Sequence, residues 1–235
     1  MRVTLGGYVY HVLNRANGRR RLFHKDGDYL AFEGILGEAL AQVPGMRLTG
    51  YCLMPNHWHL LLWPRRDGEL SDFGHWLALT HTQRWHAHYH NVGVGHLYQG
   101  RFKSFVVAAD AHYLSVCRYV ERNALRAALV PRAEPWRWGS LWRRGRCEEG
   151  LAELLQEGPV ALPGKWIEQV NEPQTEAELA ALRRSVQRSQ PYGEAGWVRR
   201  LASRLGLEST LRPLGRPRKA AQQGKKKKGQ RENGS

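Results

Sequence analysis

The sequence predicts an α+β fold of the ferredoxin-like type, in which an antiparallel sheet carries helices on one face. Three observations support this prediction. Short runs rich in aromatic and β-branched residues alternate with longer segments of helical periodicity. Their order is strand, helix, strand, strand, helix, strand, helix. A two-residue turn, Pro55-Asn56, joins the second and third strands and makes them antiparallel neighbours.

Each element has a local reason. The strands are rich in aromatic and β-branched residues, and His11 is expected among the outward residues of the first strand. The first helix ends at Pro44-Gly45, and the third follows Asp110, a residue type that favours the N-cap. The strands are predicted at residues 7–15, 47–54, 57–63 and 104–108, and the helices at residues 26–42, 69–91 and 112–130.

The third strand contains two histidines separated by one residue. Side chains alternate along a strand, so His57 and His59 share one face while Trp58, Leu60 and Leu62 share the other. The second face is wholly apolar and belongs in a core. Two imidazoles side by side can ligate one metal ion. A strand with two hydrogen-bonded histidines and no metal fits this pair equally well.

The third helix separates an apolar arc from a polar one. At 100° per residue, Tyr119 and Asn123 lie one turn apart and nearly opposite the apolar arc, with Arg126 a further turn along. The position of Tyr119 off the apolar arc argues against an ordinary core aromatic, although a second packing surface would also accommodate one. The apolar arc consists of Leu114, Cys117, Val120, Ala124 and Ala128.

Together the two motifs resemble those of the single-tyrosine HUH transposases, in particular the REP-associated tyrosine transposases. The family signature is His-hydrophobe-His on a strand and Tyr-x-x-x-Asn or Tyr-x-x-x-Gln on a later helix. The chain departs from the family at Ala124, where proline is usual; this change removes no chemical group. The resemblance covers residues 5–145, with further matches at 10–15 and 98–104, and more weakly residues 189–219.

The resemblance implies metal-dependent cleavage and rejoining of single-stranded DNA that carries a hairpin, such as a repetitive extragenic palindrome. Tyr119 matches the nucleophile that forms a 5′-phosphotyrosine bond. His57, His59 and Asn123 match the ligands of a divalent ion, Mg²⁺ or Mn²⁺. Two alternatives stay open: a module that binds hairpin DNA or RNA without cutting it, and a decayed transposase. The family includes both monomers and homodimers.

The charge of the chain also favours a nucleic-acid partner. Lys and Arg total 36 against 21 Asp and Glu, for a net charge of +15. Residues 211–235 carry nine positive charges and one negative charge, so the rest of the chain still contributes +7. A basic body favours DNA or RNA as the partner. The predicted DNA contacts are Arg15, Arg101, Lys103 and Arg126, with Arg216 and Arg218 in a segment that resembles the Gly-Arg-Pro core of an AT-hook.

The chain divides into three predicted parts. Residues 1–145 form the HUH single-tyrosine transposase domain, residues 146–210 a helical extension, and residues 211–235 a disordered basic tail. The extension contains helical stretches at 174–188 and 194–205. No apolar run reaches membrane-helix length and no signal pattern starts the chain, which predicts a cytoplasmic, nucleoid-associated bacterial protein. Cys52 and Cys117 lie in apolar runs and are expected to be buried thiols; Cys147 completes an odd number.

Overall fold

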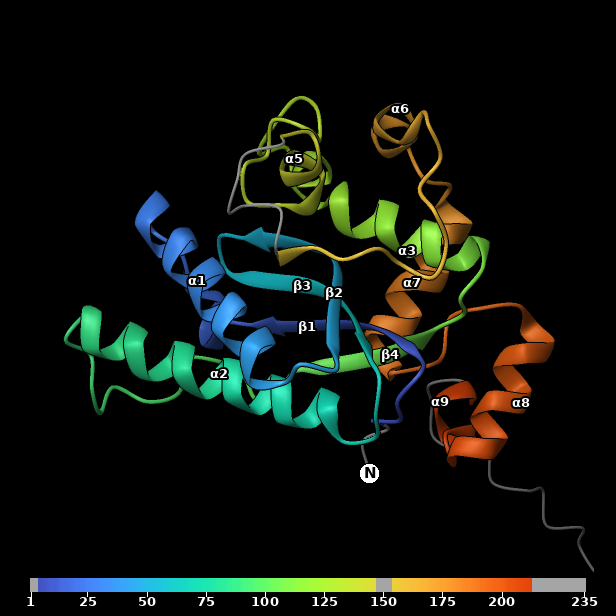
Figure 1. Cartoon of the computed structure of the whole chain (residues 1–235), viewed down its shortest axis with the longest axis horizontal. Helices are drawn as coiled ribbons and strands as arrows, with labels where there is room; N and C mark the ends of the chain where they lie inside the picture. Colours follow the sequence, from blue (N-terminus) through green and yellow to red (C-terminus); the bar gives the residue numbers. More distant parts are fainter. Residues whose placement is uncertain (1–3, 147–153, 213–235) are drawn as a thin grey trace, which may run out of the picture.

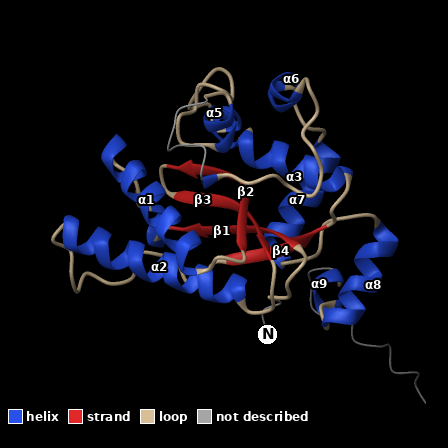
Figure 2. Ribbon diagram, in the orientation of Figure 1, coloured by secondary structure: helices blue, strands red, loops and turns tan. Residues whose placement is uncertain are grey.

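The computed structural model describes residues 4–146 and 154–212. At its centre is an antiparallel sheet with the strand order β2-β3-β1-β4 (Figures 1 and 2). The strands are β1 (Val9–Arg15), β2 (Met46–Met54), β3 (His57–Pro64) and β4 (Lys103–Val107). The predicted α+β class and the predicted order of strands and helices are confirmed. No helix in the described ranges is long and apolar enough to cross a membrane.

Helices cover both faces of the sheet, whereas the sequence predicted them on one. Helices α1 (Asp26–Gln42) and α2 (Glu69–His88) pack on one face, and α3 (Ala111–Glu121) and α4 (Asn123–Arg126) pack on the other (Figure 1). Later segments complete these two layers. They are α5 (Ser140–Arg144), α6 (Trp166–Asn171), α7 (Glu176–Arg188), α8 (Ala195–Leu205) and α9 (Glu208–Leu211), while the short helix η1 (Asn17–Arg19) follows β1.

Alternation along the strands produces two separate apolar cores. On β3, Trp58, Leu60 and Leu62 enter the core beneath α1 and α2. Leu61 enters the other core, beneath α3, together with the buried thiol of Cys52. The predicted division of β3 into two faces is therefore confirmed, and both faces are buried.

The β2–β3 hairpin places its first histidine at the end of the sheet. Met54 pairs with His57 across the Pro55-Asn56 turn, as the sequence predicted. Residue 57 is consequently the first residue of its strand, and on its other side it pairs with Arg15, the last residue of β1. One end of the sheet therefore brings together the start of β3 and the end of β1.

The tyrosine-bearing helix is shorter than predicted. Asp110 caps α3 by accepting a hydrogen bond from the backbone N–H of His112 at 2.8 Å, which confirms the predicted cap. The helix ends at Glu121, and the chain turns at Arg122 before α4 begins. Ala128 then adopts a left-handed conformation with φ of 53°. The expectation of one helix to residue 130 was wrong because side chains of later segments bind the chain at the Glu121–Arg122 turn.

The C-terminal extension is built from the predicted helices and packs on the sheet. Thr175 caps α7 and Glu194 caps α8. Between them Tyr192 extends the sheet at the outer edge of β4, accepting a hydrogen bond from Ala108 N–H and donating one to the Val106 carbonyl. At the opposite edge, Cys52 of β2 forms an isolated bridge with Gly139. Backbone from later segments thus pairs with both outer strands.

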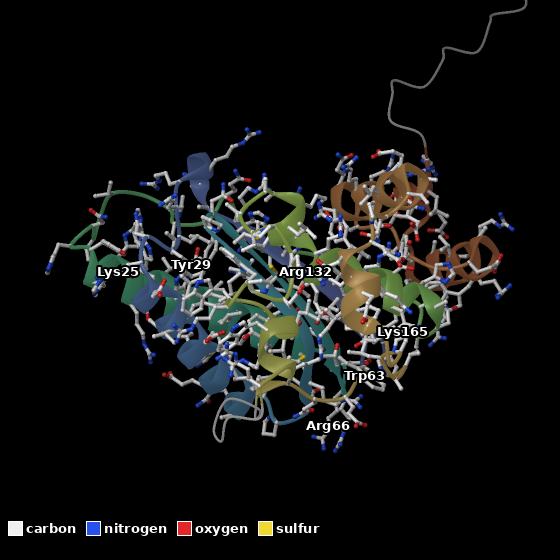
Figure 3. All side chains as sticks on the ribbon, turned by 90° about the horizontal axis from the view of Figure 1, so that it is seen from above. Lys25, Tyr29, Trp63, Arg66, Arg132 and Lys165 are labelled. Carbon is white, nitrogen blue, oxygen red and sulfur yellow. The ribbon has the colours of Figure 1, made fainter. Side chains whose placement is uncertain are left out.

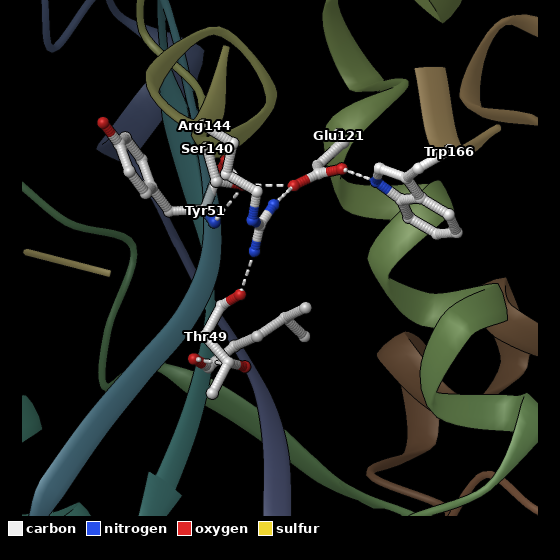
Figure 4. Close-up of polar contacts among 7 residues, drawn as sticks. Thr49, Tyr51, Glu121, Ser140, Arg144 and Trp166 are labelled. Carbon is white, nitrogen blue, oxygen red and sulfur yellow. Dashed lines mark hydrogen bonds and ion pairs between the residues drawn. The ribbon is translucent and has the colours of Figure 1, made fainter. Parts of the chain in front are cut away.

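Glu121, the last residue of α3, is the centre of a buried polar network (Figure 4). Its carboxylate accepts a hydrogen bond from the Ser140 hydroxyl at 2.5 Å and another from the Trp166 indole N–H at 2.6 Å. It also forms an ion pair with Arg144, which donates to the carbonyl of Thr49 on β2. The network ties the end of α3 to β2, α5 and α6.

Replacing Glu121 by leucine should lower the free energy of unfolding by about 3 kcal/mol, because the half-buried Arg144 guanidinium loses its counter-charge and Ser140 and Trp166 lose their acceptor. Urea unfolding of the full chain, followed by circular dichroism, measures this change. Glu121→Gln is the matched control: it keeps an oxygen acceptor of the same shape and should lose less stability than the leucine variant. A leucine variant as stable as the wild type would contradict the anchoring role of this carboxylate.

Candidate active site

His57 and His59 project from β3 toward α3, on the face that the sequence predicted. Their ring centroids lie 5.0 Å apart at an interplanar angle of 79°. His59 is buried, with 4% of its surface exposed, whereas His57 at the strand end is half-buried. The pair is therefore open to solvent on one side only.

Burial keeps both imidazoles neutral. It lowers the pKa of His57 to about 4, and the nearby charges of Arg15 and Arg126 act in the same direction. Burial also holds the pKa of His59 well below its usual value, with further contributions from His11 and His57. A neutral imidazole has a free lone pair on one ring nitrogen, so both side chains can act as metal ligands at neutral pH.

A neighbouring amide determines which nitrogen of His57 has the lone pair. Nδ1 of His57 lies 2.6 Å from Oδ1 of Asn56, the turn residue that precedes it. An amide oxygen only accepts, so Nδ1 donates its proton and Nε2 keeps the lone pair. Such a hydrogen bond fixes both the tautomer and the orientation of a ligating histidine.

A third histidine, His11, belongs to the same cluster, and the sequence did not assign it a role. Its Nε2 lies 2.8 Å from Nδ1 of His59, and the two rings are nearly parallel, with an interplanar angle of 14° and centroids 5.0 Å apart. The side chain is fully buried, so the expectation that it faces outward was wrong. The reason is topological, since β1 is an inner strand with both faces covered. Local periodicity cannot show that a strand is an inner one.

Tyr119 lies against the histidines. Its ring makes edge contacts with His59 and with His11, each at a centroid distance of 6.1 Å. It is 8% exposed and belongs to the core beneath α3, so the prediction that it avoids the buried surface was wrong. Among the described residues its hydroxyl has no hydrogen-bond partner, and it is not one of the buried unpartnered atoms. The phenol is thus packed by its ring and reached by solvent at its oxygen.

Arg126 joins the tyrosine to Asn123. Its guanidinium carbon lies 4.1 Å from the centroid of the Tyr119 ring, a cation–π contact. Its Nη2 donates to Oδ1 of Asn123 at 2.8 Å. Nδ2 of Asn123 is buried and has no partner among the described residues. A residue predicted to contact DNA therefore lies inside the site, where it holds both predicted functional side chains of this segment.

The donors at this site fit a divalent ion that also binds phosphate. Within the described residues, no three His, Cys, Asp or Glu side chains are grouped to hold a metal by themselves. Two imidazoles are available, and the Asn123 oxygen keeps a second lone pair beside the one that Arg126 uses. An ion bound here would complete its shell with water or phosphate oxygens, which is the usual coordination of Mg²⁺ in phosphoryl-transfer sites.

Basic side chains surround this end of the sheet. Arg15 pairs with His57, and Lys103 pairs with Leu13 at the start of β4, so both lie at the same end as the histidines. Lys103 and Arg101 are exposed. Figure 3 shows Lys25 toward this end of the molecule and Trp63 away from it. The predicted contacts Arg216 and Arg218 lie outside the described residues.

A second basic segment lies beside the β2–β3 turn. The exposed residues Arg19, Arg20 and Arg21 follow β1. The loop packs against the β2–β3 turn, since Asn56 donates to the carbonyl of Arg19 and Leu22 N–H donates to the carbonyl of Pro55. The three arginines therefore border the turn that leads into His57.

A groove of about 1130 Å³ opens beside Arg101, between α2 and the loop before β4. It is lined by a mixture of polar and apolar groups. They include Asn14, His75, Gln83, Gln99, Arg101 and Phe102. Asn14 and Arg101 lie close to the histidine end of the sheet, so the groove and the histidine cluster share this end.

The profile of the IS200-like transposases matches residues 4–123 of the chain. The chain belongs to the IS200-like transposase family. The matched region ends at Asn123, so Arg126 lies just outside it. It contains the other side chains of the site, which are His11, His57, His59, Tyr119 and Asn123. No curated protein matches the chain.

A solved structure supports the fold of this transposase. A REP-associated tyrosine transposase bound to a REP hairpin superposes with a TM-score of 0.52 at 14% identity, over 75% of this chain and 98% of that chain. At this identity the likeness establishes a shared fold. A protein of Deinococcus radiodurans R1 described as a transposase gives a TM-score of 0.37 at 21% identity, over 48% of this chain and 88% of that chain.

The buried histidines should make the stability of the transposase depend on pH. Burial lowers the pKa of His11 to about 3 and that of His57 to about 4; it also lowers the pKa of His81, on the buried face of α2, to about 3. Below about pH 6.5 the unfolded chain binds protons that the folded chain excludes. The free energy of unfolding should therefore reach its maximum above pH 6.5. It should decrease as the pH falls below 6.5, by at most about 1.4 kcal/mol per pH unit for each histidine.

Urea unfolding in EDTA between pH 7.5 and pH 5 measures this dependence. His75 is exposed on α2, so the His75→Asn variant should follow the wild-type curve and serves as the control. A curve that stays flat over this range would mean that the buried imidazoles are not kept neutral by the fold.

Proposed function

We propose that this transposase cuts and rejoins single-stranded DNA that carries a hairpin, through a covalent bond to Tyr119 and with a divalent metal ion, Mg²⁺ or Mn²⁺. The observation that supports this most directly is the edge contact between the Tyr119 ring and His59. It puts a phenol from α3 beside a neutral imidazole of the His-Trp-His motif. Asn123 joins the same group through Arg126.

Each residue then has one role. His57, His59 and Asn123 would hold the ion, which would polarise a phosphate oxygen and neutralise the charge that develops during transfer. Arg126 places a fixed positive charge over the Tyr119 ring and beside Asn123, where it would stabilise the negative phosphate. The packing of the phenol ring against His11 and His59 limits its rotation and orients its oxygen.

The chemical step is a phosphoryl transfer between two oxygens. The oxygen of Tyr119 attacks the phosphorus and loses its proton to solvent, while the bond from phosphorus to the 3′ oxygen breaks and that oxygen takes up a proton. The products are a 5′-phosphotyrosine and a free 3′-hydroxyl. One phosphodiester replaces another, so a second 3′-hydroxyl can reverse the step and join strands without ATP.

The substrate class follows from the surroundings of the site. Arginines border the turn before His57, and a phosphate backbone would be drawn to them. The groove beside Arg101 combines amide, imidazole and aromatic groups, which suits unpaired bases. A hairpin substrate is also supported by the fold, which is shared with a protein described as bound to a REP hairpin.

Tyr119→Phe should abolish a covalent protein–DNA adduct, because it removes the attacking oxygen and keeps the ring contacts with both histidines. The measurement is gel electrophoresis under denaturing conditions after incubation with Mn²⁺ and labelled single-stranded hairpins from the DNA that flanks this gene. Hairpin affinity in EDTA should stay within a few-fold of the wild type. An adduct that persists in the phenylalanine variant would remove Tyr119 as the nucleophile.

A second substitution tests the requirement for a metal ion. His57→Ala should lose Mn²⁺-dependent cleavage, whereas hairpin binding in EDTA should survive. Wild-type protein that binds hairpins and never cuts them, with any divalent ion, would favour a binding module over the proposed enzyme.

Replacing Arg19, Arg20 and Arg21 by glutamine should weaken hairpin binding and reduce its dependence on salt. Each lost contact with a phosphate of duplex DNA should lower the slope of log K against log salt by about 0.9. Fluorescence anisotropy between 50 and 300 mM NaCl measures the slope. The triple replacement Arg199→Gln, Arg200→Gln and Arg204→Gln is the matched control, because these exposed arginines lie on α8, at the other end of the molecule (Figure 1). Equal salt slopes for the variant at residues 19–21 and the α8 control would mean that the DNA does not contact residues 19–21.

A further inference from the structure

His11 is a polar side chain at a position where the fold would accept an apolar one. It is fully buried in an inner strand. Its ring lies 4.9 Å from Phe105 and 6.1 Å from Tyr119, so its neighbours include aromatic groups. Its Nδ1 has no hydrogen-bond partner among the described residues. A buried polar atom without a partner destabilises a protein, so a retained one calls for an explanation.

Within the described residues, the hydrogen-bond partner of His11 is His59. The two facing atoms, Nε2 of His11 and Nδ1 of His59, are 2.8 Å apart, and both imidazoles are neutral, so a single proton lies between them. Two arrangements are possible, with the proton on either ring. The two arrangements differ at Nε2 of His59, the ring nitrogen that faces away from His11. In one arrangement this nitrogen has a lone pair, and in the other it has a proton.

Only one of these arrangements leaves His59 able to bind a cation. For Nε2 of His59 to donate its lone pair, the proton of that ring must be on Nδ1. Nδ1 faces His11, so Nε2 of His11 is the acceptor available to it. The remaining proton of His11 then occupies its own Nδ1, the atom for which no partner is found.

We propose that His11 is a positioning residue for metal binding: by accepting the Nδ1 proton of His59, it allows Nε2 of His59 to act as a ligand. This inference rests on the proposed function. In this arrangement His11 accepts the Nδ1 proton of His59, as Asn56 accepts the Nδ1 proton of His57.

The two partners differ in how easily water could replace them. Asn56 and His57 are half-buried at a turn, where water can accept the same proton. His11 and His59 are buried, so a variant without an acceptor at position 11 leaves the Nδ1 proton of the ligating tautomer unpaired. Loss of the acceptor should therefore weaken metal binding more at His59 than at His57.

Mn²⁺ binding to the metal-free full chain tests the proposal, with free Mn²⁺ followed by electron paramagnetic resonance. His11→Phe, which keeps an aromatic ring in the strand, should bind Mn²⁺ about 10–100-fold more weakly. His11→Gln carries an amide oxygen near the position of Nε2 and should stay within a few-fold of the wild type. In EDTA the phenylalanine variant should unfold at about the same urea concentration as the wild type, because it removes the unpartnered Nδ1 of His11 but leaves Nδ1 of His59 without a partner. Its hairpin affinity in EDTA should be unchanged.

The outcomes separate this role from others. Equal Mn²⁺ affinity in the wild type and His11→Phe would overturn the proposal and leave the proposed function standing. Equal losses of Mn²⁺ affinity and of stability in both variants would overturn it in favour of a packing role. A wild-type chain that binds no Mn²⁺ would refute the metal site of the proposed function, and this inference with it.

Discussion

The packing of α3 on the sheet is the constraint on which the candidate site depends. The histidines are fixed by β1 and β3, whereas Tyr119 comes from a separate helix that must stop at one position along them. The end of this helix is anchored, because the buried carboxylate of Glu121 binds it to neighbouring segments. Since Tyr119 lies within a turn of Glu121, a shift of α3 that displaced the phenol would also break that network.

Local patterns in the sequence were sufficient for the parts of the fold that local physics determines. The two-residue turn at Pro55-Asn56, the two faces of β3 and the cap at Asp110 each follow from a few neighbouring residues, and the structure has all three. The candidate site was only partly predictable. The sequence placed His57 and His59 on one face, but the roles of His11 and Arg126 depend on which strands are inner ones and where α3 ends. Those properties are set by distant segments.

The extension after the family match contributes to the interior of the matched region. The match ends at residue 123, yet the partners of Glu121 are Ser140, Arg144 and Trp166. Arg118 and Arg122 on the same helix segment donate to carbonyl groups near the end of α6. A division of the chain near residue 145 would thus cut through one continuous set of contacts. In folding terms, the transposase core and the extension are expected to unfold together.

The edges of the sheet have a consequence for association between molecules. An outer strand with free N–H and C=O groups is a template on which another chain can add a strand, and it is a common start of aggregation. In the described part of this chain, the backbone of Tyr192 pairs with the outer edge of β4. The backbone at Gly139 pairs with the outer edge of β2. Another chain could pair with the sheet at these positions only after displacing these segments. The two edges are therefore partly protected against edge-to-edge polymerisation.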